Sequence, residues 1–71
     1  MTFHVVKSNP RKLSSQIEGN SFRAVCDDIA SIFGLSTTQI KAFCEIGENK
    51  ILRYSIYSGE KLIAVLEPEF E

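Results

Sequence analysis

The chain has 71 residues, which is the size of one small domain. Its eight basic and nine acidic residues give a formal net charge of −1, which argues against binding through many Lys or Arg contacts to phosphates. No apolar run reaches the roughly 18–20 residues of a membrane span, and no cationic, apolar signal segment opens the chain. We therefore expect a single domain over residues 1–71, without a membrane segment, in the cytoplasm or the nucleus.

The first twenty residues predict a hairpin. Residues 2–7 are rich in β-branched and aromatic side chains, which favour a strand. The following four residues, Ser8 to Arg11, contain Asn and Pro and predict a turn. Residues 12–18 then alternate with a period of two, as in a half-buried strand. A short helix over residues 10–18 is the alternative, with Asn9 as its cap and Gly19 at its end.

Residues 21–33 give the clearest signal, which is that of a helix. Asn20 or Ser21 can cap its first turn, and Gly34 suits the left-handed position after its last turn, with Leu35 packing back on the helix. Its apolar residues recur three and four positions apart, which predicts one stripe facing the core: Phe22, Val25, Cys26, Ile29, Ile32 and Phe33.

Residues 39–46 fit two structures, and the choice between them decides the predicted function. As a strand, Ile40, Ala42, Cys44 and Ile46 alternate with polar or outward-facing residues. As a helix, residues 36–39 form a capping box. After a turn at 47–50, residues 51–57 alternate again. A second turn at 58–61 precedes the apolar run 62–66, which suits a central strand buried on both faces.

Taken in order, these segments resemble the ubiquitin-like β-grasp family. The likeness includes the opening strand MTFHVVK with its turn SNPRK, the second strand LSSQIE, and the helix NSFRAVCDDIASIFGL. It ends with ILRYSIYSGEKLIAVLE, in which Leu52, Tyr54, Ile56 and Leu62 occupy the positions of the family's closing strands. The interaction domains of the PB1 and CIDE-N type share the pattern from Phe22 to Leu35. The resemblance implies an α+β fold, with a mixed sheet of four to five strands packed on the helix at 21–33.

Two departures from the family narrow the function that the resemblance implies. The chain ends Leu66-Glu67-Pro68-Glu69-Phe70-Glu71, without the Gly-Gly ending needed for conjugation, so we expect no covalent tagging. Lys7 stands where PB1-type domains carry a basic residue, but the loop 45–49 is thinly acidic, which argues against charge-driven head-to-tail assembly. The expected function is that of a non-catalytic domain that binds a protein partner.

The alternation of the strands predicts the surface used for binding. If Phe3 and Val5 point inward, their neighbours in the first strand point outward. The same reasoning applies to the strands at 39–46 and 62–66, which lie beside the first strand in a β-grasp sheet. The predicted partner-binding residues, on the face opposite the helix and with Phe43 as the aromatic anchor, are His4, Val6, Lys41, Phe43, Ile63 and Val65. Such a face can also pair with a copy of itself.

A helix-turn-helix over residues 28–45 is the competing interpretation. Ala30, Gly34 and Ile40 have the spacing of that motif, and a hairpin at 51–66 would then serve as a wing. Thr37, Thr38, Lys41 and Glu45 would face the major groove of DNA. The single Lys in this segment and the negative net charge argue against nucleic-acid binding.

The sequence does not contain a pattern typical of an enzyme. His4 is the only histidine, metal-ligand spacings and a phosphate-binding glycine loop are absent, and adjacent Asp27 and Asp28 fall on the solvent side of the predicted helix. We therefore expect no catalytic residue, metal, cofactor or small-molecule substrate. Cys26 and Cys44 both lie among apolar residues, which predicts two buried free thiols. The glutamates at 67, 69 and 71 predict a solubilising acidic tail.

Overall fold

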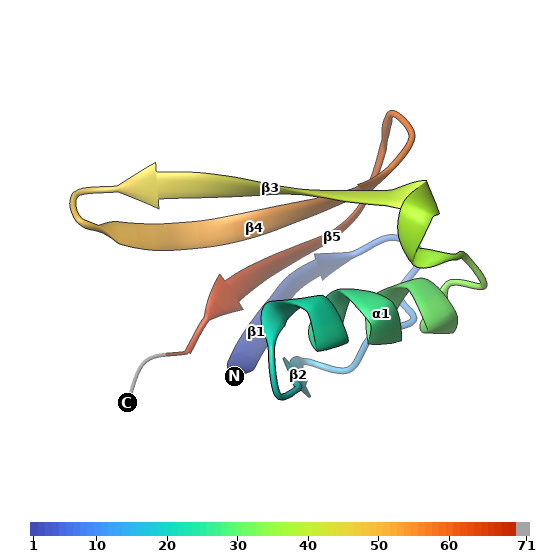
Figure 1. Ribbon diagram of the computed structural model, residues 1–71, viewed down its shortest axis with the longest axis horizontal. Coiled ribbons are helices and arrows are strands. Elements are labelled where there is room, and N and C mark those ends of the chain that lie inside the picture. Colours follow the sequence, from blue (N-terminus) through green and yellow to red (C-terminus); the bar gives the residue numbers. More distant parts are fainter. Residues whose placement is uncertain (70–71) are drawn as a thin grey trace.

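The computed structural model describes residues 1–69 and contains one α-helix and five strands (Figure 1). Phe70 and Glu71, the end of the predicted acidic tail, lie outside the described residues. The elements, in chain order, are β1 Thr2–Ser8, β2 Gln16–Glu18, α1 Phe22–Ile32, the 3-10 helix η1 Thr37–Gln39, β3 Ile40–Gly47, β4 Lys50–Ser58 and β5 Lys61–Pro68. The predicted strands at 2–7, 51–57 and 62–66 and the predicted helix are confirmed.

The five strands form one antiparallel sheet in the order β2-β1-β5-β4-β3. The predicted α+β class is confirmed, but the predicted mixed sheet is wrong, because β1 and β5 run antiparallel. The tight turns after β3 and β4 make β3, β4 and β5 antiparallel to one another. The direction of β5 relative to β1 depends on how the connection through α1 orients β3 relative to β2, and the local pattern does not contain this information.

Helix α1 begins and ends as its flanking residues predict. The backbone N–H of Ala24 donates to the Ser21 hydroxyl at 3.2 Å, which caps the first turn. After the last turn, Gly34 takes a positive φ of 72°. The backbone N–H groups of Gly34 and Leu35 then donate to the carbonyls of Ser31 and Ala30, at 3.1 and 2.8 Å. These two bonds are those of a Schellman ending.

The core lies between α1 and one face of the sheet. Its largest fully buried side chains come from β1, α1, β4 and β5, and they are Phe3, Val25, Ile29, Ile56 and Leu66. The Phe22 and Tyr54 rings stack at 4.2 Å between centroids, and both meet Phe3 edge-on. The predicted helix stripe needs one correction: Ile32 is 46% exposed, whereas Ala30 is buried.

The first hairpin is shorter than its alternation predicts. Only Gln16–Glu18 pairs with β1, and a loop replaces the start of the predicted strand. Leu13 and Ile17 still pack against the core, as the period of two indicates. The alternative helix over residues 10–18 does not form.

The ambiguous segment at 39–46 is a strand. The capping residues behave as a helix start, because the Ser36 N–H donates to the Gln39 side-chain oxygen at 2.7 Å. The helix nevertheless lasts only for η1, and the Thr37 hydroxyl ties it to Asp27 of α1 at 2.7 Å. From Ile40 to Gly47 the chain is the strand β3, which pairs with β4 along the whole of β3. The second helix of the helix-turn-helix interpretation is therefore absent from residues 1–69.

Candidate interaction surface

Phe43 lies on the face of the sheet that points away from α1. It pairs with Ser55 of β4, which in turn pairs with Val65 of β5, so the three share one row. The adjacent row contains Ile56 and Ala64, which are core residues. Because side chains alternate along a strand, Phe43 must point to the opposite side, and it is 58% exposed.

The neighbours of Phe43 make a small apolar centre with charged edges. Its ring meets the Tyr57 ring edge-on, with 5.5 Å between centroids. Lys41 lies opposite Tyr57, and on the other side of Phe43 the Arg53 Nε contacts the Glu45 Oε2 at 3.0 Å. We call this set of five residues the Phe43 surface: Lys41, Phe43, Glu45, Arg53 and Tyr57.

Strand β3 forms one edge of the sheet and, within residues 1–69, pairs only with β4. Residues 41–46 are exposed along this edge, including those on the side of the helix. The tip of the long β3–β4 hairpin extends beyond the start of α1, so the helix does not cover it (Figure 1). Ile46 is consequently 72% exposed. For the same reason Cys44 is exposed, so its predicted burial is wrong, whereas Cys26 is buried as predicted.

The prediction that Ile63 points outward is wrong. Ile56 pairs with Ala64 and Tyr57 with Leu62, so Ile63 is an extra residue in β5, a β-bulge. The bulge turns Ile63 into the core, where it is 3% exposed, and moves Leu62 to the outer row beside Tyr57. One extra residue thus reverses the two faces for the part of β5 that precedes it.

Val65 does point outward, since it shares a row with Phe43, but it offers little surface. It is only 8% exposed, because β5 is the middle strand and Val65 is flanked by Lys7 and Ser55. Sequence alternation gave its direction correctly and could not give its exposure.

The predicted adjacency of β1, β3 and β5 is also wrong, because β4 lies between β3 and β5. Three strand spacings therefore separate β3 from β1, a distance of about 14 Å. Val6 is 54% exposed and His4 is exposed, as predicted, but both lie on β1. The six predicted residues do not make one site: Lys41 and Phe43 lie together, and His4 and Val6 lie elsewhere.

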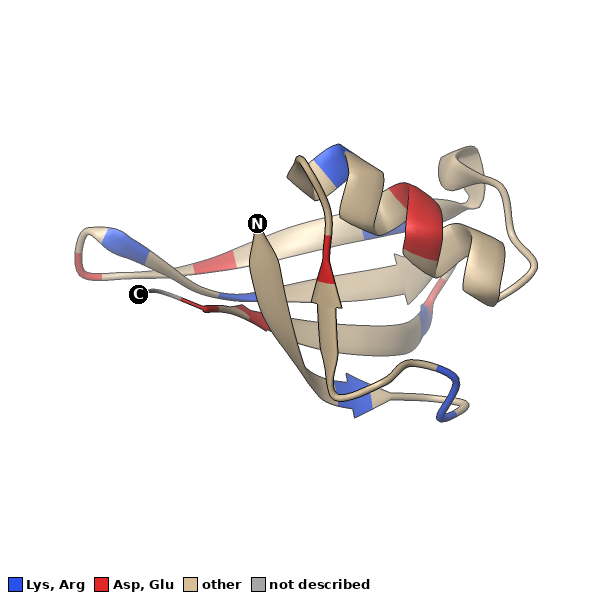
Figure 2. Ribbon diagram, turned by 90° about the horizontal axis from the view of Figure 1, so that it is seen from below, with Lys and Arg blue, Asp and Glu red and all other residues tan. Residues whose placement is uncertain are grey.

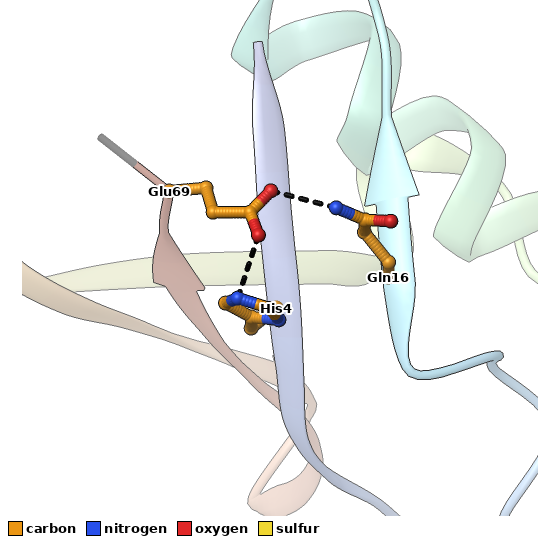
Figure 3. Close-up of polar contacts among 3 residues, drawn as sticks. All are labelled: His4, Gln16 and Glu69. Carbon is orange, nitrogen blue, oxygen red and sulfur yellow. Dashed lines mark hydrogen bonds and ion pairs between the residues drawn. The ribbon is translucent and has the colours of Figure 1, made fainter. Parts of the chain in front are cut away.

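His4 belongs to a polar cluster near the β2–β1 end of the sheet, away from β3 (Figure 3). Its Nε2 lies 2.7 Å from one carboxylate oxygen of Glu69. The Gln16 amide donates to the other oxygen at 2.6 Å, so Glu69 links the residues of two strands, β1 and β2. The side chain of His4 is thus occupied in holding the chain after β5 against the first hairpin.

The described part of the chain has several surface hollows. One, of about 560 Å³, lies at the loop after β1 and is lined by Val6, Lys7 and Arg11 among others. A more apolar groove of about 340 Å³ lies between Met1, Ile51 and Tyr54. Within residues 1–69, no three His, Cys, Asp or Glu side chains are grouped so as to hold a metal ion. No helix in this part of the chain is long and apolar enough to cross a membrane.

Sequence reasoning missed three members of the Phe43 surface: Glu45, Arg53 and Tyr57. The turn at 47–50 indicates only that residues 50–58 lie beside residues 40–47, because the extra residue Leu52 shifts the pairing by one. Without it, residues 52–56 and not 53–57 would lie opposite residues 41–45. The side of Tyr57, by contrast, follows from its position next to inward-pointing Ile56.

Basic side chains are scattered over the molecule. Figure 2 shows Lys and Arg on the loop after β1, at the start of α1 and at the β3–β4 hairpin, with acidic residues between them. Comparison with known proteins adds no relative: no protein-family model matches the chain, and no curated protein or solved structure matches it either.

Proposed function

We propose that this chain is a non-catalytic protein-interaction module that docks an extended segment of a partner protein along β3, with Phe43 as the anchor. The observation that carries the proposal is the exposure of Phe43, 58%, on a strand whose outer edge is covered by no other strand of the described chain. An edge strand presents unpaired N–H and C=O groups that an added strand can satisfy. Aromatic side chains supply much of the binding energy at such contacts.

The surroundings of Phe43 support the same role. Tyr57 holds one edge of the ring, which limits the rotamer freedom lost when a partner binds. Lys41 on one side and the Arg53–Glu45 pair on the other provide a polar rim around the apolar centre. Scattered basic residues and the absence of a second α-helix within residues 1–69 give DNA binding no comparable support.

The more specific part of this proposal is that the module resembles a ubiquitin-like domain. The order of hairpin, helix and three further strands agrees with that family, whereas the antiparallel pairing of β1 with β5 does not. Docking along β3 requires only the exposed edge and its aromatic anchor. The docking proposal therefore does not depend on whether the chain belongs to that family.

The test begins with partners captured from native extract, each then purified and titrated against wild type, Phe43→Ala and Val6→Ala. Val6 is the matched control, because it is similarly exposed, at 54%, and three strands away. We expect Phe43→Ala to weaken binding about thirtyfold or more, the loss typical of a central aromatic contact, and Val6→Ala to leave it unchanged. Equal binding by wild type and Phe43→Ala would overturn the proposal.

A further inference from the structure

The charges on the outer side of β3 are arranged symmetrically about Phe43. Lys41 lies two residues before it and Glu45 two residues after it, and all three point to the same face. If two copies of β3 pair antiparallel around a two-fold axis at Phe43, each Lys41 lies opposite Glu45 of the other copy. We propose that the partner docked along β3 is a second copy of this chain, joined in this register.

The rest of the strand agrees with the same register. On the side of the helix, Ala42 falls opposite Cys44 of the second copy and Ile40 opposite its Ile46. Among the large apolar residues of 1–69, Ile46 is the most exposed, at 72%, and it would gain an apolar neighbour. At the axis, the two Phe43 rings would face each other, each supported by its own Tyr57.

Other registers fit less well. An axis at Lys41 places two lysines opposite each other, and an axis at Glu45 does the same with two glutamates. Like charges directly opposite on neighbouring strands are destabilising. An axis at Ala42 or Cys44 leaves both charges without an opposite partner and sets Phe43 against Lys41 or Glu45. Only the axis at Phe43 pairs every charged residue of β3 with its complement.

The pattern also lacks the usual protection of an edge strand. Proteins prevent edge strands from pairing by means of prolines, very short strands or uncompensated charged side chains, above all lysine. β3 has eight residues and no proline, and its two charges are opposite in sign. In the dimer, Glu45 would lie between two basic side chains: Arg53 of its own chain, which it already contacts, and Lys41 of the second copy. The net charge of −1 produces little long-range repulsion between chains.

This inference rests on the proposed function, because it names the occupant of the same strand. One pair of strands buries an area at or below the low end for specific interfaces, so the dimer should be weak and require concentrations of about 0.1–1 mM. Sedimentation equilibrium across that range should show the mass rising from 8.0 kDa toward twice that value.

Charge reversal tests both the self-pairing and its register. Lys41→Glu alone and Glu45→Lys alone each replace two attractive pairs by two repulsive ones, and we expect dimerisation to weaken tenfold or more. An equimolar mixture of the two variants restores complementary charges in the mixed dimer, and so does the double variant Lys41→Glu/Glu45→Lys in its own dimer. Recovery in the mixture also demonstrates that both single variants are folded.

Amide hydrogen exchange locates the contact. At high concentration, the N–H groups of residues 40–46 that do not bond to β4 should exchange at least tenfold more slowly than in dilute samples. A chain that stays monomeric over the whole range overturns the self-pairing. If the wild type dimerises but the mixture of the two charge variants does not regain dimerisation, the proposed register is overturned. Neither result touches the docking proposal, which is judged by the effect of Phe43→Ala on purified partners.

Discussion

The Phe43 and Tyr57 rings meet edge-on, 5.5 Å apart between centroids, on the outer face of the sheet. The pair joins the edge strand β3 to its neighbour β4, and it is separated from the core by the sheet itself. An aromatic pair in this position contributes little to the folding of the core and leaves a large ring accessible to another molecule. This separation makes the role of Phe43 open to a clean test.

Phe43→Ala should lower the free energy of unfolding by only about 0.5–1 kcal/mol, because it removes a mostly exposed ring and one edge-on contact. Phe3→Ala is the matched comparison, since Phe3 is 1% exposed and packs on both Phe22 and Tyr54. Its loss should cost about 3–5 kcal/mol. Urea denaturation followed by circular dichroism measures both. A large loss from Phe43→Ala would mean that the ring is structural.

Ile63→Ala should lower the free energy of unfolding by about 2–4 kcal/mol, because the bulge in β5 buries this side chain in the core. Ile46→Ala removes the same atoms from a residue that is 72% exposed, and it should change stability by about 0.5 kcal/mol or less. Thermal and urea unfolding of the two variants give the comparison. Similar losses in both would place Ile63 outside the core.

The two thiols should react at different rates with a thiol reagent such as a maleimide. Cys44 is exposed and should react at once in the folded protein at low concentration. Burial, and to a lesser extent the neighbouring Asp27 carboxylate, raises the pKa of the Cys26 thiol, so its reactive thiolate is scarce. We expect its reaction to be at least about a hundredfold slower and to require opening of the fold.

The variants Cys44→Ser and Cys26→Ser assign the two phases, and one fast phase in Cys44→Ser would contradict the burial of Cys26. The raised pKa also predicts a pH effect. The unfolded thiol, with its ordinary pKa of 9.0, loses its proton first as the pH rises. The free energy of unfolding should therefore fall above about pH 9 and be unaffected by this group at neutral pH.

Local interactions explain why the helix was predictable almost to the residue. Its start depends on Ser21, three residues from the amide that it caps, and its end on Gly34, whose neighbours bond back within one turn. The turn at 47–50 and the alternation in residues 51–57 are likewise contained in short stretches of chain. Residues 39–46 were ambiguous because the capping box at Ser36 and Gln39 forms in either case, and only pairing with β4 makes the following residues a strand.

The outward direction of Phe43 followed from alternation and is correct, but the composition of the site did not follow. Extra residues at Val6 in β1, at Leu52 in β4 and at Ile63 in β5 shift the register between strands. A bulge depends on how two strands fit together, so neither strand alone reveals it. The exposure of Cys44 has a similar origin, since it depends on the place of β3 at the edge of the sheet.

The sequence by itself determined the helix and its two ends, the positions of the turns and the alternation of each strand, because neighbouring residues set those features. The tertiary structure alone decided the order and direction of the strands, the three bulges and the place of β3 at the edge of the sheet. These features depend on contacts between residues far apart in the chain, and such contacts do not produce a periodic pattern in the sequence. The exposed edge beside Phe43, on which both proposals rest, belongs to this second group.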